Sequence, residues 1–155
     1  MIASNLQNRS LTNHPQTAQW EIRLDEPDFM RWKSTLNEPC LFFDGASKGN
    51  PGIAAGGGMI LLANGNVISK YSWGLGIDSN NVAELCGLLQ GLKIALSKGI
   101  GKLSVFGDSR LLINALIKKK SPSHLKLGQI YHKIQHLSKN FQTIRFFHVL
   151  RGLNS

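Results

Sequence analysis

The stretch CLFFDGASKGNPG, residues 40–52, decides how the rest of this sequence is interpreted. Its apolar start and the Asp44-Gly45 step predict a strand over 40–47 that ends in a turn. The glycines that follow also occur in phosphate-binding loops. The stretch lacks the Gly-Lys-Ser/Thr ending of such loops, and a strand is expected after it, so we do not expect a nucleotide-binding loop. Its amides and small side chains can still approach a sugar–phosphate backbone.

Outward from this strand, the apolar periodicity predicts the order β-β-β-α-β-α-α-β. Further strands are expected at 53–65, 66–76, 102–108 and 141–150, with Asn64-Gly65-Asn66 as a hairpin turn. Helices are expected at 81–98, 109–120 and 124–140. This order predicts an α/β fold with a five-stranded mixed sheet, three antiparallel strands followed by parallel ones, flanked by helices.

The chain divides into a polar leader, residues 1–37, and one compact domain, residues 38–155. In the leader, the alternation of Trp20, Ile22 and Leu24 is typical of one short strand. Apolar residues that can dock on the domain follow it: Phe29, Met30 and Trp32. The first residues are free of acids until Glu21, which is a feature of organelle transit peptides, but we favour a disordered leader.

The charge is distributed unevenly along the chain. Residues 1–90 hold six Lys/Arg and eight Asp/Glu, whereas residues 91–155 hold twelve Lys/Arg and one Asp. A basic half of this kind favours a polyanionic partner, and a merely solvated basic face is an equally good interpretation of charge alone. Trp73 and four lysines are candidates for contacts to DNA, or are simply surface: Lys118, Lys119, Lys120 and Lys126.

Cysteine content and hydropathy exclude several classes of protein. Cys40 and Cys86 are too few for a disulfide framework or a zinc cluster, and their apolar neighbours predict buried free thiols in a reducing, intracellular compartment. No apolar run is long enough to span a membrane. We expect a monomer without an organic cofactor.

Three acidic residues stand where predicted elements end or begin: Asp44, Glu84 and Asp108. If the strands before Asp44 and Asp108 are parallel neighbours, both side chains lie at the same sheet edge, and the helix that carries Glu84 can bring it there. Three carboxylates so close repel one another, which raises their pKa values unless cations neutralise them. Oxygen ligands alone favour Mg²⁺ or Mn²⁺, and two such ions can cleave a phosphodiester.

Each of these residues also has a purely structural interpretation. Asp44-Gly45 is a common turn dipeptide. Asn81 and Glu84 have the spacing of a capping box, and Asp108-Ser109 can cap the helix that follows. His148, at the end of the last strand, is either structural or a general acid–base group. The asparagines on neighbouring loops suit contacts to bases and 2′-hydroxyls, and equally suit turns and caps.

Four motifs occur in order: FDGASKGNPG (43–52), SNNVAEL (79–85), FGDSRLLI (106–113) and FHVLRGLN (147–154). Their order and spacing resemble the type 1 ribonuclease H family, especially its plant-type and retroelement-derived branch, often called reverse-transcriptase-like. The resemblance covers about residues 38–155. It implies a ribonuclease H-like fold and endonucleolytic hydrolysis of the RNA strand of an RNA–DNA hybrid, leaving a 5′-phosphate and a 3′-hydroxyl. It also implies a reverse transcriptase as a fused or separate partner.

The resemblance further implies roles for single residues. Asp44, Glu84 and Asp108 match the acids of the family that hold two Mg²⁺ ions, and His148 matches its loop histidine. Residues at positions that contact the hybrid in the family are Gly45, Ser47, Asn50, Ser79, Asn80, Asn81 and Asn154. The fourth acid of the family begins a closing helix and would fall beyond Ser155, so we expect a C-terminally truncated domain without its final helix. A nucleic-acid-binding module that no longer cuts is the alternative hypothesis.

Overall fold

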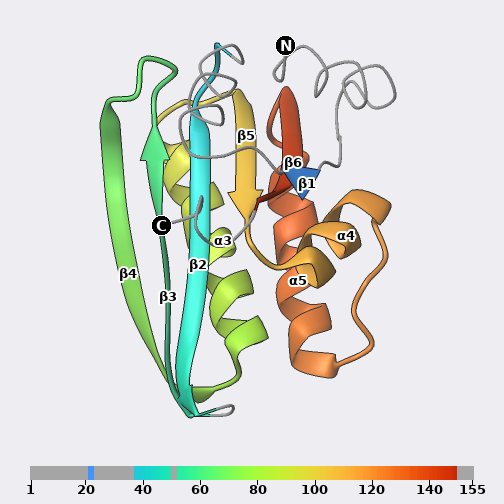
Figure 1. The fold of residues 1–155 in the computed structure, drawn as a ribbon. Coiled ribbons are helices and arrows are strands. Elements are labelled where there is room, and N and C mark those ends of the chain that lie inside the picture. Colours follow the sequence, from blue (N-terminus) through green and yellow to red (C-terminus); the bar gives the residue numbers. More distant parts are fainter. Residues whose placement is uncertain (1–20, 23–36, 50–51, 150–155) are drawn as a thin grey trace.

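The computed structural model describes residues 21–22, 37–49 and 52–149. In chain order, the elements are β1 (Glu21–Ile22), β2 (Cys40–Gly49), β3 (Gly52–Leu61), β4 (Val67–Asp78), α3 (Asn80–Ser97), β5 (Lys102–Gly107), α4 (Arg110–Lys118), α5 (Leu125–Ser138) and β6 (Thr143–Val149). Every helix and strand expected between residues 40 and 150 is therefore present (Figure 1).

The strands form one mixed sheet in the order β1-β6-β5-β2-β3-β4. Strands β2, β3 and β4 pair antiparallel, whereas β5 pairs parallel with β2 and with β6. The predicted α/β fold and the predicted division into antiparallel and parallel halves are confirmed. The two-residue β1 adds a sixth strand, which pairs parallel with β6. It falls within the stretch from Trp20 to Leu24, where the sequence predicted one short strand.

Several predicted ends differ from the observed ones, and two of the differences have a clear physical cause. The first strand continues through Asp44 to Gly49, because β3 pairs with it along its whole length. The helix expected at 109–120 ends at Lys118, because Lys119 takes the left-handed conformation at φ 55° and its N–H bonds the carbonyl of Ala115.

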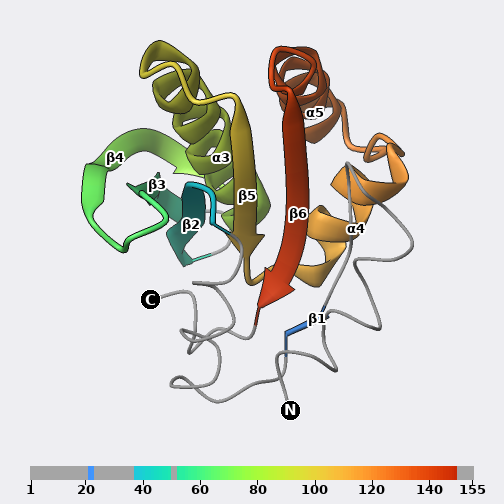
Figure 2. The same cartoon turned by 90° about the horizontal axis from the view of Figure 1, so that it is seen from above.

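The helices α3, α4 and α5 gather on one face of the sheet (Figure 2). The buried core between that face and the helices includes Leu41 and Phe43 of β2, Val105 of β5 and Phe146 of β6. Alternate residues of these strands point away from the helices. No described helix is long and apolar enough to cross a membrane. Cys40 is buried, Cys86 is half-buried, and both thiols are free.

Candidate active site

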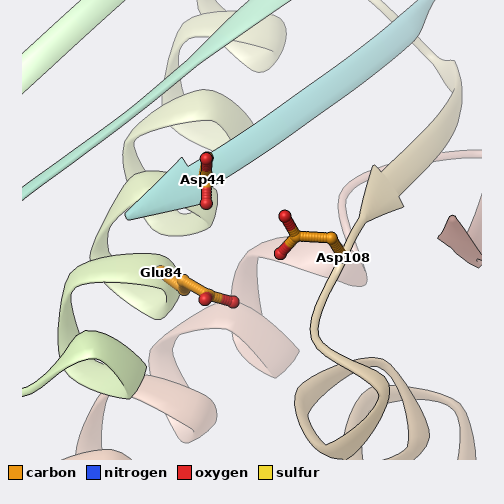
Figure 3. Close-up of side chains that lie close together, drawn as sticks. All are labelled: Asp44, Glu84 and Asp108. Atoms are coloured by element: carbon orange, nitrogen blue, oxygen red, sulfur yellow. The ribbon is translucent and has the colours of Figure 1, made fainter. Parts of the chain in front are cut away.

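Asp44, Glu84 and Asp108 meet at one place, although 24 to 64 residues separate them in sequence. One carboxylate oxygen of each lies within 4.8 Å of those of the other two. The three side chains come from β2, α3 and the end of β5, and they turn toward a common space (Figure 3). The structure therefore brings together all three acids that the sequence predicted as metal ligands.

The parallel pairing of β2 with β5 places the two aspartates. The last paired residues are Phe42 and Phe106, and each aspartate follows two residues later in its strand direction. Beyond this pair β5 ends and β2 continues along β3, so the two chains separate. A gap of this kind beyond the carboxyl ends of parallel strands is where α/β proteins place their functional groups.

Glycines allow α3 to approach the sheet closely enough to deliver Glu84. A Cβ atom at Gly45 would lie 2.3 Å from both the carbonyl carbon of Ala83 and the amide nitrogen of Glu84. A Cβ at Gly87 would lie 2.7 Å from the carbonyl oxygen of Asp44. Because these are backbone atoms, a side chain at either position would push the helix away from β2. The absence of side chains thus sets the separation between Glu84 and Asp44.

The structure tests the structural interpretations of the three acids one by one. The side chain of Ser79, rather than that of Asn81, caps α3 by accepting from the amide of Val82, so Glu84 is not part of a capping box. Ser109 caps α4 by accepting from the amide of Leu112. Asp44 lies inside a strand rather than in a turn. The capping box at Glu84 and the turn at Asp44 were therefore wrong, whereas the cap predicted at Asp108-Ser109 is formed by Ser109.

The donor set fits a hard divalent cation. All three groups supply carboxylate oxygens, the ligands preferred by Mg²⁺ and Mn²⁺ over zinc. Glu84 is buried and Asp44 is exposed, so the cluster combines a desolvated carboxylate with an opening to solvent. The amide of Gly45 donates to Asp44 Oδ1 at 2.8 Å and orients that carboxylate. Close carboxylates are costly to charge together without a cation between them.

Several of the predicted hybrid-contacting residues surround this cluster. The amide and the hydroxyl of Ser47 both donate to Asn80 Oδ1, at 2.7 and 2.9 Å. Ser79 caps α3, and Asn81 occupies its first turn. Gly45 packs against α3 rather than facing away from it. Asn50 and Asn154 lie outside the described residues.

His148 lies near the end of β6, as the strand pattern predicted, and pairs there with Gly107. Its side chain is buried, and Nε2 lies 3.3 Å from the backbone carbonyl oxygen of Asp108. The strand continues to Val149 because it remains paired with β1. The imidazole thus contacts the backbone that carries Asp108, whereas its predicted role in proton transfer stays a prediction.

Two contacts near the site were not predicted. The hydroxyl of Tyr71 donates to the carbonyl of Gly87 at 2.6 Å and ties β4 to α3, and burial raises the pKa of this phenol. Lys126 of α5 pairs with Asp78 at the end of β4, which lowers the pKa of that carboxyl. Sequence spacing gave no signal for either, because the partners are 16 and 48 residues apart. Lys126 is therefore partly neutralised, rather than simply a surface cation.

Comparison with known proteins agrees with this fold. Residues 42–155 match the reverse transcriptase-like family. A bifunctional protein of Mycobacterium tuberculosis is 33% identical over 113 residues, which make up 72% of this chain and 31% of that protein. The chain thus spans about a third of the length of this relative.

Solved structures show the same fold. The N-terminal RNase H domain of a Mycobacterium tuberculosis protein, fused to maltose-binding protein, superposes with a TM-score of 0.72 and 31% identity, covering 76% of this chain and 90% of that one. A compost-derived RNase H1, solved in complex with an RNA/DNA hybrid, gives 0.71 and 26%, covering 76% and 89%. The chain belongs to the reverse transcriptase-like family, and within it to the type 1 ribonuclease H group that its motifs predicted.

Proposed function

We propose that this chain is a metal-dependent endoribonuclease that hydrolyses the RNA strand of an RNA–DNA hybrid, leaving a 5′-phosphate and a 3′-hydroxyl. The observation that carries the proposal is the cluster of Asp44, Glu84 and Asp108 within 4.8 Å at the sheet edge. The named RNase H relatives and the hybrid complex of one of them support the substrate class.

The three acids would hold two Mg²⁺ ions, with Mn²⁺ as a substitute. When bound, such ions activate a water and stabilise the leaving oxygen of a phosphodiester. The chain's own contribution is position: β2 and β5 fix the two aspartates, and the close approach of α3 fixes Glu84. Because Glu84 is buried, its carboxylate is held with little freedom to move.

Residues around the cluster would hold the hybrid. Ser47, Ser79, Asn80 and Asn81 lie at the end of β2 and the start of α3, beside the acids. Serine and asparagine side chains suit phosphate oxygens, base edges and the 2′-hydroxyl that distinguishes RNA from DNA. Asn50 and Asn154 stay predictions in the same role. His148 is proposed to hold the Asp108 backbone in place through its Nε2 contact.

The test is cleavage of a labelled RNA–DNA hybrid by the full chain in Mg²⁺ or Mn²⁺. We expect RNA-strand cleavage that EDTA stops and that Asp44→Asn abolishes. Asp78→Asn is the matched control, because Asp78 is an acid at the end of β4 outside the cluster, and it should leave cleavage within a few-fold of wild type. Cleavage that survives EDTA or Asp44→Asn would overturn the proposed mechanism.

Single-stranded RNA and duplex DNA serve as further substrates and should remain intact. Tight hybrid binding without cleavage, even in Mn²⁺, would instead identify a binding module that no longer cuts. We also propose a reverse transcriptase as a fused or separate partner, because the matching family is reverse transcriptase-like. Co-purification of the chain with such an enzyme from its natural source tests this partnership.

A further inference from the structure

The sheet face opposite the helices carries a ladder of three stacked phenylalanines, Phe42, Phe106 and Phe147. The ring centroids of Phe42 and Phe106 are 4.8 Å apart, and those of Phe106 and Phe147 are 5.0 Å apart. Each alternates with a residue of the helix-side core, so all three point away from α3, α4 and α5. We call these residues the aromatic ladder.

The aromatic ladder is buried. Phe106 and Phe147 are 0% exposed and Phe42 is 8% exposed. All the described helices lie on the other face (Figure 2), so none of them accounts for this burial. A sheet face of three aromatic rings is a large apolar area whose burial favours folding, and no helix among residues 37–49 and 52–149 provides the cover.

The chain enters β2 from this same face. Arg145 alternates with Phe146 of the helix-side core, so it points the same way as the aromatic ladder. Its guanidinium pairs with the carboxylate of Glu38, which is buried just before β2. The segment that leads into β2 is thus attached to the ladder face at its last residues.

The connection from β1 to β2 must cross the sheet. Strand β1 is parallel to β6, and β6, β5 and β2 are parallel to one another, so β1 and β2 run in the same direction. Crossovers between parallel strands are almost always right-handed. From β5 to β6 the chain moves across the sheet toward the β1 edge, and its helices lie on the helix face. From β1 to β2 the chain moves across the sheet in the opposite direction, away from the β1 edge. A crossover of the same hand in this direction is expected on the ladder face.

Residues 23–36, RLDEPDFMRWKSTL, have the length and the pattern for this crossing. The end of β1 and the start of β2 are three strand spacings apart across the sheet and about four residues apart along the strands, which makes roughly 20 Å. A helix of 14 residues would span about 21 Å. Pro27 is a typical first residue of a helix. Phe29, Trp32 and Leu36 follow at i, i+3 and i+7, the spacing of one apolar helix face.

We propose that residues 23–36 cross the ladder face and cover the aromatic ladder with Phe29, Trp32 and Leu36. The leader thereby becomes part of the domain and supports β2 and β5, the two strands that lead to Asp44 and Asp108. This inference does not depend on the proposed nuclease activity, since it concerns only what packs on the sheet.

A double-mutant cycle in the full chain tests the contact. Trp32→Leu and Phe106→Leu each destabilise the fold, and we expect their effects on the unfolding equilibrium constant to be non-additive by about 2-fold to 100-fold. Trp73→Leu with Phe106→Leu is the control cycle, because Trp73 lies on β4 with 45% of its surface exposed. Additivity in the first cycle as in the control would overturn the proposal.

A fluorescence measurement decides the question if a double variant does not fold. Trp20→Phe with Trp73→Phe leaves Trp32 as the only tryptophan, and Trp20→Phe with Trp32→Phe leaves Trp73. We expect acrylamide to quench Trp32 at least about 2-fold less than the half-exposed Trp73. Equal or stronger quenching of Trp32 contradicts the proposal. So does shielding that appears only as protein concentration rises, because a second copy would then cover the face.

Discussion

Ser47 and Asn80 are joined by two hydrogen bonds to one acceptor, the side-chain oxygen of Asn80. This oxygen links the end of β2 to the first residue of α3, the two elements that carry Asp44 and Glu84. The relative position of two members of the carboxylate cluster therefore depends on a contact between Ser47, predicted as a hybrid ligand, and Asn80, predicted as a hybrid ligand or as a turn and cap residue.

Two substitutions of Asn80 separate its structural role from its role in binding. Asn80→Asp keeps a side-chain oxygen that accepts from Ser47 but loses the amide donor, so stability should change little while affinity for the hybrid falls. Asn80→Ala removes the acceptor, and we expect a loss of about 1–2 kcal/mol in the free energy of unfolding. Urea unfolding and hybrid binding at fixed salt measure the two effects. Equal stability of both variants would show that the link is not important.

Gly45→Ala should displace α3. The new methyl group would meet the backbone of Ala83 and Glu84 at 2.3 Å, and overpacking of this kind costs about 1–3 kcal/mol. Gly74→Ala is the matched control, because no atom lies within 4 Å of a Cβ there, and it should change stability by less than about 0.5 kcal/mol. Urea unfolding and Mn²⁺ titration of both variants measure the effect. Unchanged Mn²⁺ affinity in Gly45→Ala would contradict the role of this close approach.

In Tyr71→Phe, the free energy of unfolding should fall less steeply as pH rises above 10 than it does in the wild type. Burial raises the pKa of Tyr71 above its ordinary value near 10, so its contribution is complete below pH 10 and is lost as pH rises toward the folded-state pKa. The wild type should lose about 1.4 kcal/mol more per pH unit above 10 than the variant. At pH 7 the variant should be about 1 kcal/mol less stable, since the bond to Gly87 is gone. Parallel stability curves from pH 7 to 11 would refute this assignment.

His148→Gln distinguishes proton transfer from positioning. Because Nε2 contacts the Asp108 carbonyl from inside β6, we expect cleavage to fall by a similar factor at every pH, with the shape of the pH–rate profile unchanged. A general acid–base group would remove one limb of that profile. Single-turnover rates from pH 5 to 9 on a labelled hybrid provide the measurement, and loss of a limb would restore the catalytic interpretation.

The antiparallel and parallel halves of the sheet followed from local patterns. The strands of β2, β3 and β4 are marked by short apolar runs and by a glycine turn, where Gly65 takes a φ of 91°. The three acids could be chosen because each stands beside an apolar element and matches a motif. His148 was correctly expected near the end of the last strand, but its contact with the Asp108 carbonyl could not be predicted, because it joins segments 40 residues apart.

By itself, the sequence determined which segments become helices and strands, because burial of one face imposes a period on each of them. It also determined the three acids and the family. Only the tertiary structure decided that these carboxylates meet, since the distance between Asp44 and Glu84 is set by backbone packing at Gly45 and Gly87. The face occupied by the aromatic ladder was likewise decided by strand order and handedness, which act between segments far apart in the chain.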